Sequence, residues 1–476
     1  MSQVKIMFKN MSWVMISQLI ASILGFIWTI LIARYLGVER YGILGFATSI
    51  VGLISVTLDL GITTYSIRQI ATDYDSTSKY LNNILPLKCL LAIGTFALLF
   101  IILTLKKFDE TTLTITLLFM INSIFQNFTT TMNGSFQAFE KMKYQGIGNT
   151  LTTVLLFIFI LITIYTDWGL LGITGAYILA NAIGFIYEYI SFNRHILKPK
   201  FEIDKAFCKQ LLISALPFAI GGMLYTVYYS IDAVMLSQIS GNYATGIYNA
   251  TYRLISVLTL FYSIYSSVIY PVMSKYFKND KRLLVISYEK SVKYLMLVMI
   301  PLSVATMFYS LDVIQLIYGH QYDAASSALC ILIWTVCLLF VNGPGNTLLT
   351  ASHKEVSVTK IYLIAAIFNI ILNLILIPYL SFIGAAITTV LSDILIFIIQ
   401  KFIIHKIGQK PAKKLYYDIG KIIIGSLILA IALYFLKLNM WVAIPVGIII
   451  YFLTVYLLRV FDDDDKYVIK EILGKN

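Results

Sequence analysis

The feature that most constrains this chain is a series of fourteen long apolar runs, most of them separated by short polar segments. A transmembrane helix needs about 20 consecutive apolar residues to cross the hydrocarbon core of a bilayer. Hydrophobic residues make up 59% of the 476 residues and charged residues only 13%, which is more apolar surface than a soluble domain can bury. The sequence therefore predicts an all-α integral membrane protein with about fourteen transmembrane helices.

The fourteen predicted spans are 11–33, 42–67, 80–105, 112–137, 144–166, 169–192, 210–238, 247–274, 289–311, 324–350, 358–378, 381–403, 419–436 and 439–458. One uncharged run, 361–392, is too long for a single crossing. We divide it at IPYLSF (377–382), because Pro378 disfavours the helical conformation of the residue before it.

The distribution of Lys and Arg predicts the orientation of these spans. If the N-terminus is cytoplasmic, 29 of the 36 basic residues lie on the cytoplasmic side and five on the outer side. Such an excess of basic residues is typical of cytoplasmic loops. We therefore expect a multi-pass protein of the cytoplasmic membrane with both termini in the cytoplasm. The acidic segment DDDDK, Asp462 to Lys466, is expected to be a solvated tail after the last span.

Two pairs of similar segments indicate an internal repeat. LGVERYGIL after the first span resembles SGNYATGIY after the seventh, 204 residues later, and GA pairs in spans six and twelve are 209 residues apart. Two halves of six spans have the same orientation, so a pseudo-two-fold axis along the membrane normal is expected to relate them. The predicted domains are a six-helix bundle at 1–192, a cytoplasmic linker at 193–209, a second bundle at 210–405, and two extra helices with a tail at 406–476.

This architecture favours a transporter that works by alternating access. The four Cys and four His lack metal-ligand spacing, so we expect no metal site. The chain contains no nucleotide-binding loop of the GxxxxGK[ST] type, and no loop is long enough to hold a catalytic domain. The basic residues lie in short loops and not on a soluble face, which argues against a nucleic-acid partner. We therefore expect neither an enzyme nor a bound organic cofactor.

Charged residues inside the predicted spans are the candidates for function, because a charge at the bilayer centre is expensive and must face protein or water. Away from the ends of the spans they are Asp59, Lys88, Glu188, Asp232, Arg253 and Asp393. Asp232 precedes the turn between spans seven and eight by about as many residues as Arg253 follows it, so both lie at similar depth. Two interpretations remain open, namely a structural ion pair, or a site in which Arg253 holds an anionic group and Asp232 tunes it.

For the other four intramembrane charges, a structural role and a functional role are again both open. Asp59 in TLDLGI has no partner in its own span, and Lys88 follows Pro86, where a kink could turn it inward. Either residue can line a cavity or belong to a structural pair. Glu188 and Asp393 lie towards the cytoplasmic ends of their spans, so we expect their side chains to extend to the interface.

Four segments together resemble the oligosaccharide flippases of the O-antigen and Wzx type, within the multidrug/oligosaccharidyl-lipid/polysaccharide (MOP) exporter superfamily. They are IARYLGVERYGILGF (32–46), LDLGITTYSIRQIA (58–71), SGNYATGIYNATYRL (240–254) with Asp232 before it, and NLILIPYLSFIGAA (373–386). The resemblance covers essentially the whole chain, including two six-span halves and two terminal spans. It rests on the order and spacing of these segments and not on any single motif.

The resemblance implies a function. A flippase of this kind moves a polyprenyl phosphate- or diphosphate-linked oligosaccharide to the outer leaflet, where glycan polymerases or glycosyltransferases use it. It also implies a cation within the cavity, which Arg253 matches, with Arg34, Arg68 and Lys88 as further candidates. The resemblance implies a strongly cationic cavity, but the spans of this chain contain four intramembrane acids and only two bases, which departs from that pattern. Asp59 and Asp232 suggest coupling to H⁺ or Na⁺.

Two other transport functions stay open. A cation-coupled multidrug exporter of the same superfamily is favoured by acids in the cavity, although fourteen spans and the RYLG and DLG motifs argue against it. A flippase for the lipid-linked peptidoglycan precursor has the same chemistry and differs in the glycolipid that it carries.

Overall fold

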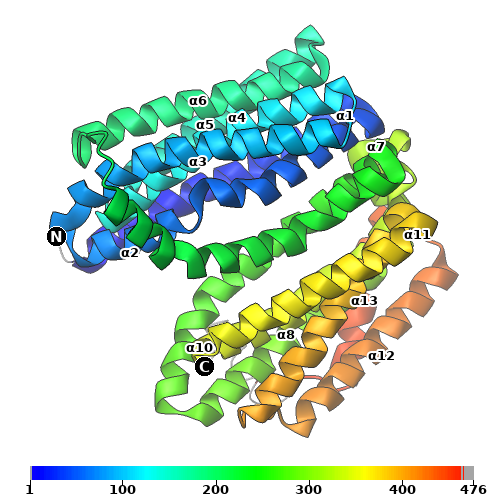
Figure 1. Cartoon of the computed structure of the whole chain (residues 1–476). Coiled ribbons are helices and arrows are strands. Elements are labelled where there is room, and N and C mark those ends of the chain that lie inside the picture. The colour runs from blue at the N-terminus through cyan, green and yellow to red at the C-terminus, as the bar shows by residue number, and fades with distance from the viewer. Residues whose placement is uncertain (1–2, 462–464, 466–476) are drawn as a thin grey trace. The chain divides into compact units, whose positions relative to one another are not determined.

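A computed structural model of the chain describes residues 3–461 and residue 465 (Figure 1). Within this part of the chain every regular element is helical, and eleven helices are long and apolar enough to cross a membrane. Large apolar side chains remain on the outside of these helices, for example Ile93 at 69% and Phe402 at 67% exposure. Exposed apolar surface of this extent suits contact with lipid and not with water. The predicted all-α integral membrane architecture is therefore confirmed.

The chain divides into two compact units, Met1–Asn249 and Ala250–Asn476. The helices of the first unit are α1 (Gln3–Asp59), α2 (Ile62–Thr72), α3 (Thr77–Leu105), α4 (Glu110–Ala138), α5 (Met142–Thr166), α6 (Gly169–His195) and the N-terminal part of α7 (Lys205–Asn279). In this unit α4, α5 and α6 pack against one another and α1 packs against α4 and α5 (Figure 1).

The second unit begins with the C-terminal part of α7. Its other helices are α8 (Lys281–Phe308), α9 (Ser310–Tyr318), α10 (Ala325–Ala351), α11 (Glu355–Lys406), α12 (Lys413–Leu436) and α13 (Met440–Leu457). Short 3₁₀ turns occur at Tyr74–Ser76 and His320–Tyr322. The linker predicted at 193–209 separates the two repeated halves of the sequence, which are defined differently from these compact units. That division stays a prediction.

Three long helices each run through a predicted turn between two spans, and each has one non-helical residue at that turn. These residues are Gly37 in α1, Gly241 in α7 and Ser381 in α11. The two glycines have φ angles of 72° and 83°, in the left-handed region that glycine adopts without steric cost. The sequence therefore located these three turns correctly.

The predicted second span, 42–67, is interrupted, which corrects the expectation of one continuous helix. α1 ends at Asp59, α2 begins at Ile62, and Leu60 and Gly61 between them have positive φ angles. Gly61 also permits close packing, because a side chain there would collide with the backbone of α7 at Ala215. Both requirements explain why the helix breaks at the sequence DLG.

The two similar glycine-containing loops of the repeat lie against each other within the first unit. A side chain at Gly42 would collide with the backbone of Asn242, and one at Gly246 would collide with the backbone of Val38. Gly42 and Gly246 are 204 residues apart, and so are Val38 and Asn242. The contact is therefore reciprocal, as expected where equivalent segments meet across a two-fold axis. This geometry supports the repeat that the sequence predicts.

An ion cluster ties the C-terminal end of the second unit to α8. Lys293 is 3% exposed, and its Nζ lies 3.1 Å from Asp418 Oδ2 in α12 and 2.6 Å from Asp465 Oδ2. Lys290 also pairs with Asp465, to which Tyr294 Oη donates a hydrogen bond of 2.5 Å. These five residues form the C-terminal ion cluster. The expectation of a solvated DDDDK segment is wrong for Asp465, whose side chain is fully buried, and the rest of that segment lies outside the described residues.

Candidate functional site

The break between α1 and α2 places a carboxylate inside the first unit. Asp59 is the last residue of α1, and both of its carboxylate oxygens lie 3.3 Å from the backbone nitrogen of Thr63. The Thr63 hydroxyl also donates to Asp59. Thr63 belongs to the first turn of α2, where unpaired N–H groups and the helix dipole attract a negative group. The helix break therefore holds the Asp59 carboxylate in place.

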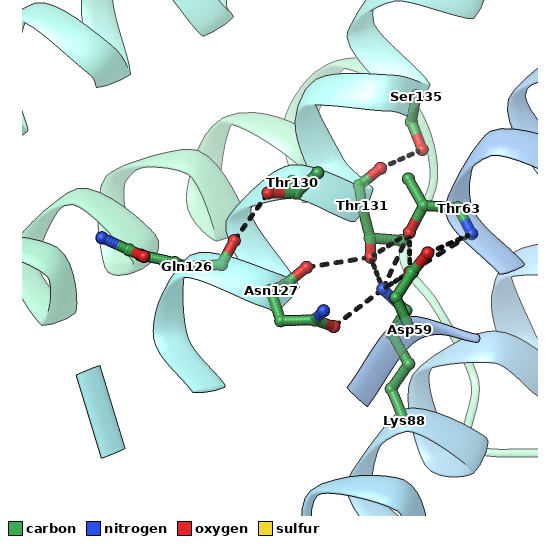
Figure 2. A network of polar contacts seen from close by, with 8 residues as sticks. All are labelled: Asp59, Thr63, Lys88, Gln126, Asn127, Thr130, Thr131 and Ser135. Atoms are coloured by element: carbon green, nitrogen blue, oxygen red, sulfur yellow. Dashed lines mark hydrogen bonds and ion pairs between the residues drawn. The ribbon is translucent and has the colours of Figure 1, made fainter. Parts of the chain in front are cut away.

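Lys88 approaches this carboxylate from α3. Its side chain is 1% exposed, and its Nζ lies 2.6 Å from Asp59 Oδ1. The same Nζ donates to Thr63 Oγ1 at 2.8 Å, to Asn127 Oδ1 at 2.8 Å and to Thr131 Oγ1 at 2.6 Å (Figure 2). An ammonium group has three donors, so these four oxygens occupy all of them. We call these five residues the Lys88 network.

The Lys88 network balances one positive charge with one negative charge, and neutral oxygens complete the coordination. Removing one member of a buried ion pair typically costs ~3–5 kcal/mol, because the other charge is left uncompensated. The two partners differ in access, since the Asp59 side chain is 25% exposed while Lys88 is enclosed. A proton or a small cation can therefore reach the carboxylate more easily than an anion can reach the ammonium.

Of the six predicted site residues, the structure brings Asp59 and Lys88 together. Arg34 in α1, Arg68 in α2 and Arg253 in α7 are all exposed. Their expected contacts with an anionic substrate stay predictions.

Asp232 is buried on α7, at 3% exposure. Its Oδ2 accepts a hydrogen bond of 2.8 Å from Tyr248 Oη, which also belongs to the first unit. The predicted relation of Asp232 to Arg253, which lies in the second unit, stays a prediction.

The sequence analysis did not identify the neutral partners of Lys88. Asn127 and Thr131 are four residues apart on α4, so they share one helix face. The available signal was the polar run QNFTTTMN (126–133) inside an otherwise apolar span. Glu188 and Asp393 were expected to extend to the interface, but they are 0% and 7% exposed, so that expectation is wrong.

Comparison with known families identifies the kind of protein to which this chain belongs. The sequence pattern of the polysaccharide biosynthesis protein family matches residues 7–277. The chain belongs to this family. The pattern of the MatE family also matches, over residues 217–375. Both matches place this polysaccharide biosynthesis family member in the MOP exporter superfamily, as the sequence motifs predict.

Curated relatives of this family member are distant in sequence. It is 24% identical over 397 residues to the capsular polysaccharide biosynthesis protein CapF of Staphylococcus aureus. The aligned region covers 81% of this chain and 96% of CapF. It is 27% identical over 304 residues to an uncharacterised membrane protein of Methanocaldococcus jannaschii, covering 61% of this chain and 58% of that protein. It is 25% identical over 268 residues to the probable low-salt glycan biosynthesis flippase Agl15 of Haloferax volcanii, covering 53% and 54%.

Solved structures share the fold over most of the chain. The lipid II flippase MurJ in an inward closed conformation gives a TM-score of 0.79 at 16% identity, covering 93% of this chain and 98% of that one. An inward-facing multidrug resistance transporter of the MATE family gives 0.65 at 13% identity, covering 81% and 96%. The polysaccharide biosynthesis family member therefore has the helical transporter fold of the MOP superfamily.

Proposed function

We propose that this protein is a flippase for a polyprenyl phosphate- or diphosphate-linked oligosaccharide. It moves the glycolipid from the cytoplasmic to the outer leaflet of the cytoplasmic membrane by alternating access, for the synthesis of a cell-surface glycan. Glycan polymerases or glycosyltransferases supply the glycolipid and use it after transfer. The observation that carries this proposal is the extent of the family match, residues 7–277, together with a flippase-like fold over 93% of the chain.

The orientation of the chain is part of the proposal. Both termini are cytoplasmic, because this arrangement puts 29 of the 36 basic residues on the cytoplasmic side. The reciprocal contact around Gly42 and Gly246 then lies on the outer side. While this contact is closed, the substrate cavity does not open to the outer side, and the glycolipid can enter it from the cytoplasmic side.

The charged residues have distinct proposed roles. Arg253 holds the phosphate group, since a guanidinium donates two parallel hydrogen bonds to phosphate oxygens, and Arg34 and Arg68 supply further positive charge. The Asp232 carboxylate adjusts the strength with which that site binds the phosphate. Asp59 is the coupling residue, because it is the accessible member of the Lys88 network. Binding of H⁺ or Na⁺ to Asp59 weakens its hold on Lys88 and links the ion gradient to movement of α1, α2, α3 and α4.

A strain that lacks the protein tests the function. Its lipids are extracted and polyprenyl-linked oligosaccharide is quantified, with the wild type, Arg253→Ala and Asp232→Asn as complementing genes. We expect the glycolipid to accumulate without the protein, the wild type to clear it and Arg253→Ala to leave it accumulated. The proposal fails if no lipid-linked oligosaccharide accumulates in the deletion strain.

The MatE match over residues 217–375 supports a second candidate, a cation-coupled multidrug exporter. The same deletion strain separates the two functions. An exporter would leave the lipid-linked oligosaccharide unchanged and would make the strain sensitive to cationic drugs. A peptidoglycan-precursor flippase would instead cause that particular glycolipid to accumulate, which the composition of the extracted sugar would reveal.

A further inference from the structure

A polar hollow inside the first unit belongs to none of the sites described above. It has a volume of about 430 Å³, which lies within the range of ~300–1,000 Å³ that is typical of small-molecule sites. Side chains of four helices line it, and most are amides or hydroxyls. The amides are Gln18 of α1, Gln126 and Asn133 of α4, Gln145 and Asn149 of α5, and Asn181 of α6.

Several of these amides are unpaired. Within residues 3–461 and 465, the side chains of Gln18, Gln126 and Asn149 have no hydrogen-bond partner, and the buried Oδ1 of Asn133 has none either. Gln126 extends from α4 away from the Lys88 network (Figure 2). An amide without a partner is costly in an apolar environment, and in the bilayer core only protein, water or a ligand can supply one. Asn133 Oδ1 is the buried one of these groups, and the more accessible amides beside it can bond a polar molecule that enters the hollow.

The hollow also has a mouth and a floor. Gln18, Gln126 and Thr130 are exposed, whereas Gln145 and Thr153 are buried. A ligand can therefore enter past the exposed amides and reach the buried groups.

The chemistry of the lining selects the ligand. No Lys, Arg, Asp or Glu is among the residues that line the hollow. A phosphate group would need cationic donors, and an apolar drug would need apolar or aromatic walls. Amides and hydroxyls each offer both a donor and an acceptor, which matches the hydroxyl groups of a neutral sugar.

We infer that this hollow is a binding site for a neutral sugar unit of the glycolipid. The inference rests on the proposed function and names a part of the substrate that the charged residues do not hold. The phosphate and the sugar are then recognised separately, by cations for the first and by uncharged amides of α1, α4, α5 and α6 for the second. Glu188 on α6 lies beside Gly148, next to the lining residue Asn149, so the ionisable group placed here is an acid, which does not attract an anion.

Binding to two matched lipids tests this inference. The probes are the polyprenyl-linked oligosaccharide pool extracted from the deletion strain, and a polyprenyl phosphate that carries no glycan, called the stripped lipid. The purified full-length protein in lipid nanodiscs is titrated with each probe, and the ratio of the two dissociation constants measures the contribution of the sugar. Wild type is compared with Gln126→Leu, with Gln126→Leu/Asn149→Leu, and with Gln238→Leu as control. Gln238 is an exposed amide of α7 outside the hollow.

We expect the wild type and Gln238→Leu to bind the glycan-bearing lipid at least about tenfold more tightly than the stripped lipid, a difference of ~1.4 kcal/mol. The double variant should bind both lipids equally, with unchanged affinity for the stripped lipid, and Gln126→Leu should fall between. A double variant that keeps the wild-type ratio would overturn the inference alone. Equal loss of affinity for both lipids would also overturn it, since the amides would then serve the fold. A wild-type protein that binds neither lipid would refute the proposed function as well.

Discussion

The protein contains two buried ion clusters that are built differently. In the Lys88 network of the first unit, one lysine meets one carboxylate and three neutral oxygens, and that carboxylate is 25% exposed. In the C-terminal ion cluster of the second unit, Lys293 meets two carboxylates, and the Asp465 side chain is fully buried. The first cluster lies at a helix break, whereas the second joins α8, α12 and the residue Asp465.

This difference shows that a buried charge does not by itself indicate function in a membrane protein. Both clusters pair their buried charges, as burial of a charge requires. In the C-terminal ion cluster Lys290 is the partly exposed member, at 28%, whereas the two carboxylates, Asp418 and Asp465, are only 8% and 0% exposed, so a proton or cation reaches them less easily than it reaches Asp59. The Lys88 network has an accessible carboxylate, so its charge balance can change while the helices remain folded. We therefore propose that the first cluster serves transport and the second stability.

The largest expected effect is on the C-terminal ion cluster. Lys293→Met leaves Asp418 and Asp465 buried with Lys290 as their remaining counter-charge within the cluster, so we expect a loss of ~3–5 kcal/mol in stability. Thermal unfolding in detergent and the amount of protein in the membrane measure it. If Lys293→Met unfolded like the wild type, the cluster would not stabilise the fold.

The next effect concerns the Lys88 network. Asp59→Asn keeps an oxygen near Lys88 but leaves the buried ammonium without its counter-charge, so we expect a loss of about 3 kcal/mol in stability, at the lower end of the range for a buried pair because Asp59 is 25% exposed. Transport of the glycolipid into the outer leaflet of proteoliposomes should no longer respond to a pH or Na⁺ gradient. An Asp59→Asn protein with wild-type gradient response would remove Asp59 from ion coupling.

A backbone contact extends the comparison beyond charged residues. Gly42→Ala adds a methyl group that collides with the backbone at Asn242, and overpacking of this kind costs ~1–3 kcal/mol. We expect reduced transport, because the reciprocal loop contact can no longer close. Gly221→Ala is the matched control, since a side chain there meets no neighbouring atom within 4 Å. Equal transport by both variants would show that this contact plays no part in the cycle.

The smallest effect is at the edge of the C-terminal ion cluster. Lys290 pairs with the same carboxylate as Lys293, but its side chain is 28% exposed. After Lys290→Met, Lys293 still balances the buried Asp465 carboxylate, so we expect a loss of about 1 kcal/mol in the same unfolding measurement, smaller than that of Lys293→Met. A loss as large as that of Lys293→Met would mean that burial does not distinguish the two lysines.

The sequence predicted the spans and turns well because those features depend on local patterns. Runs of apolar residues fix each crossing, and Gly37 and Gly241 mark two of the turns. The sequence also identified Asp59 and Lys88 as unusual. It could not predict that they pair, because they are 29 residues apart on helices whose rotation and packing are set by distant contacts.

The same limit explains the errors. Asp465 was expected in solvent, because the sequence pattern does not show that the chain after α13 returns to α8. Glu188 was expected at the interface, although Gly148 on the neighbouring helix leaves room to bury it. The amide hollow is likewise formed by four helices, so it is visible only after they are assembled.

The most direct test of the account replaces each cluster with apolar residues of similar size. Asp59→Leu/Lys88→Met neutralises the Lys88 network, and Lys290→Met/Lys293→Met/Asp418→Leu/Asp465→Leu neutralises the C-terminal ion cluster. Apolar replacement of a complete buried pair is often neutral for stability, so both variants should fold and insert. Glycolipid transport should fall at least about tenfold in the first variant, equivalent to ~1.4 kcal/mol, and stay near wild type in the second. Retained transport in the first variant, or its loss in a folded second variant, would contradict the account.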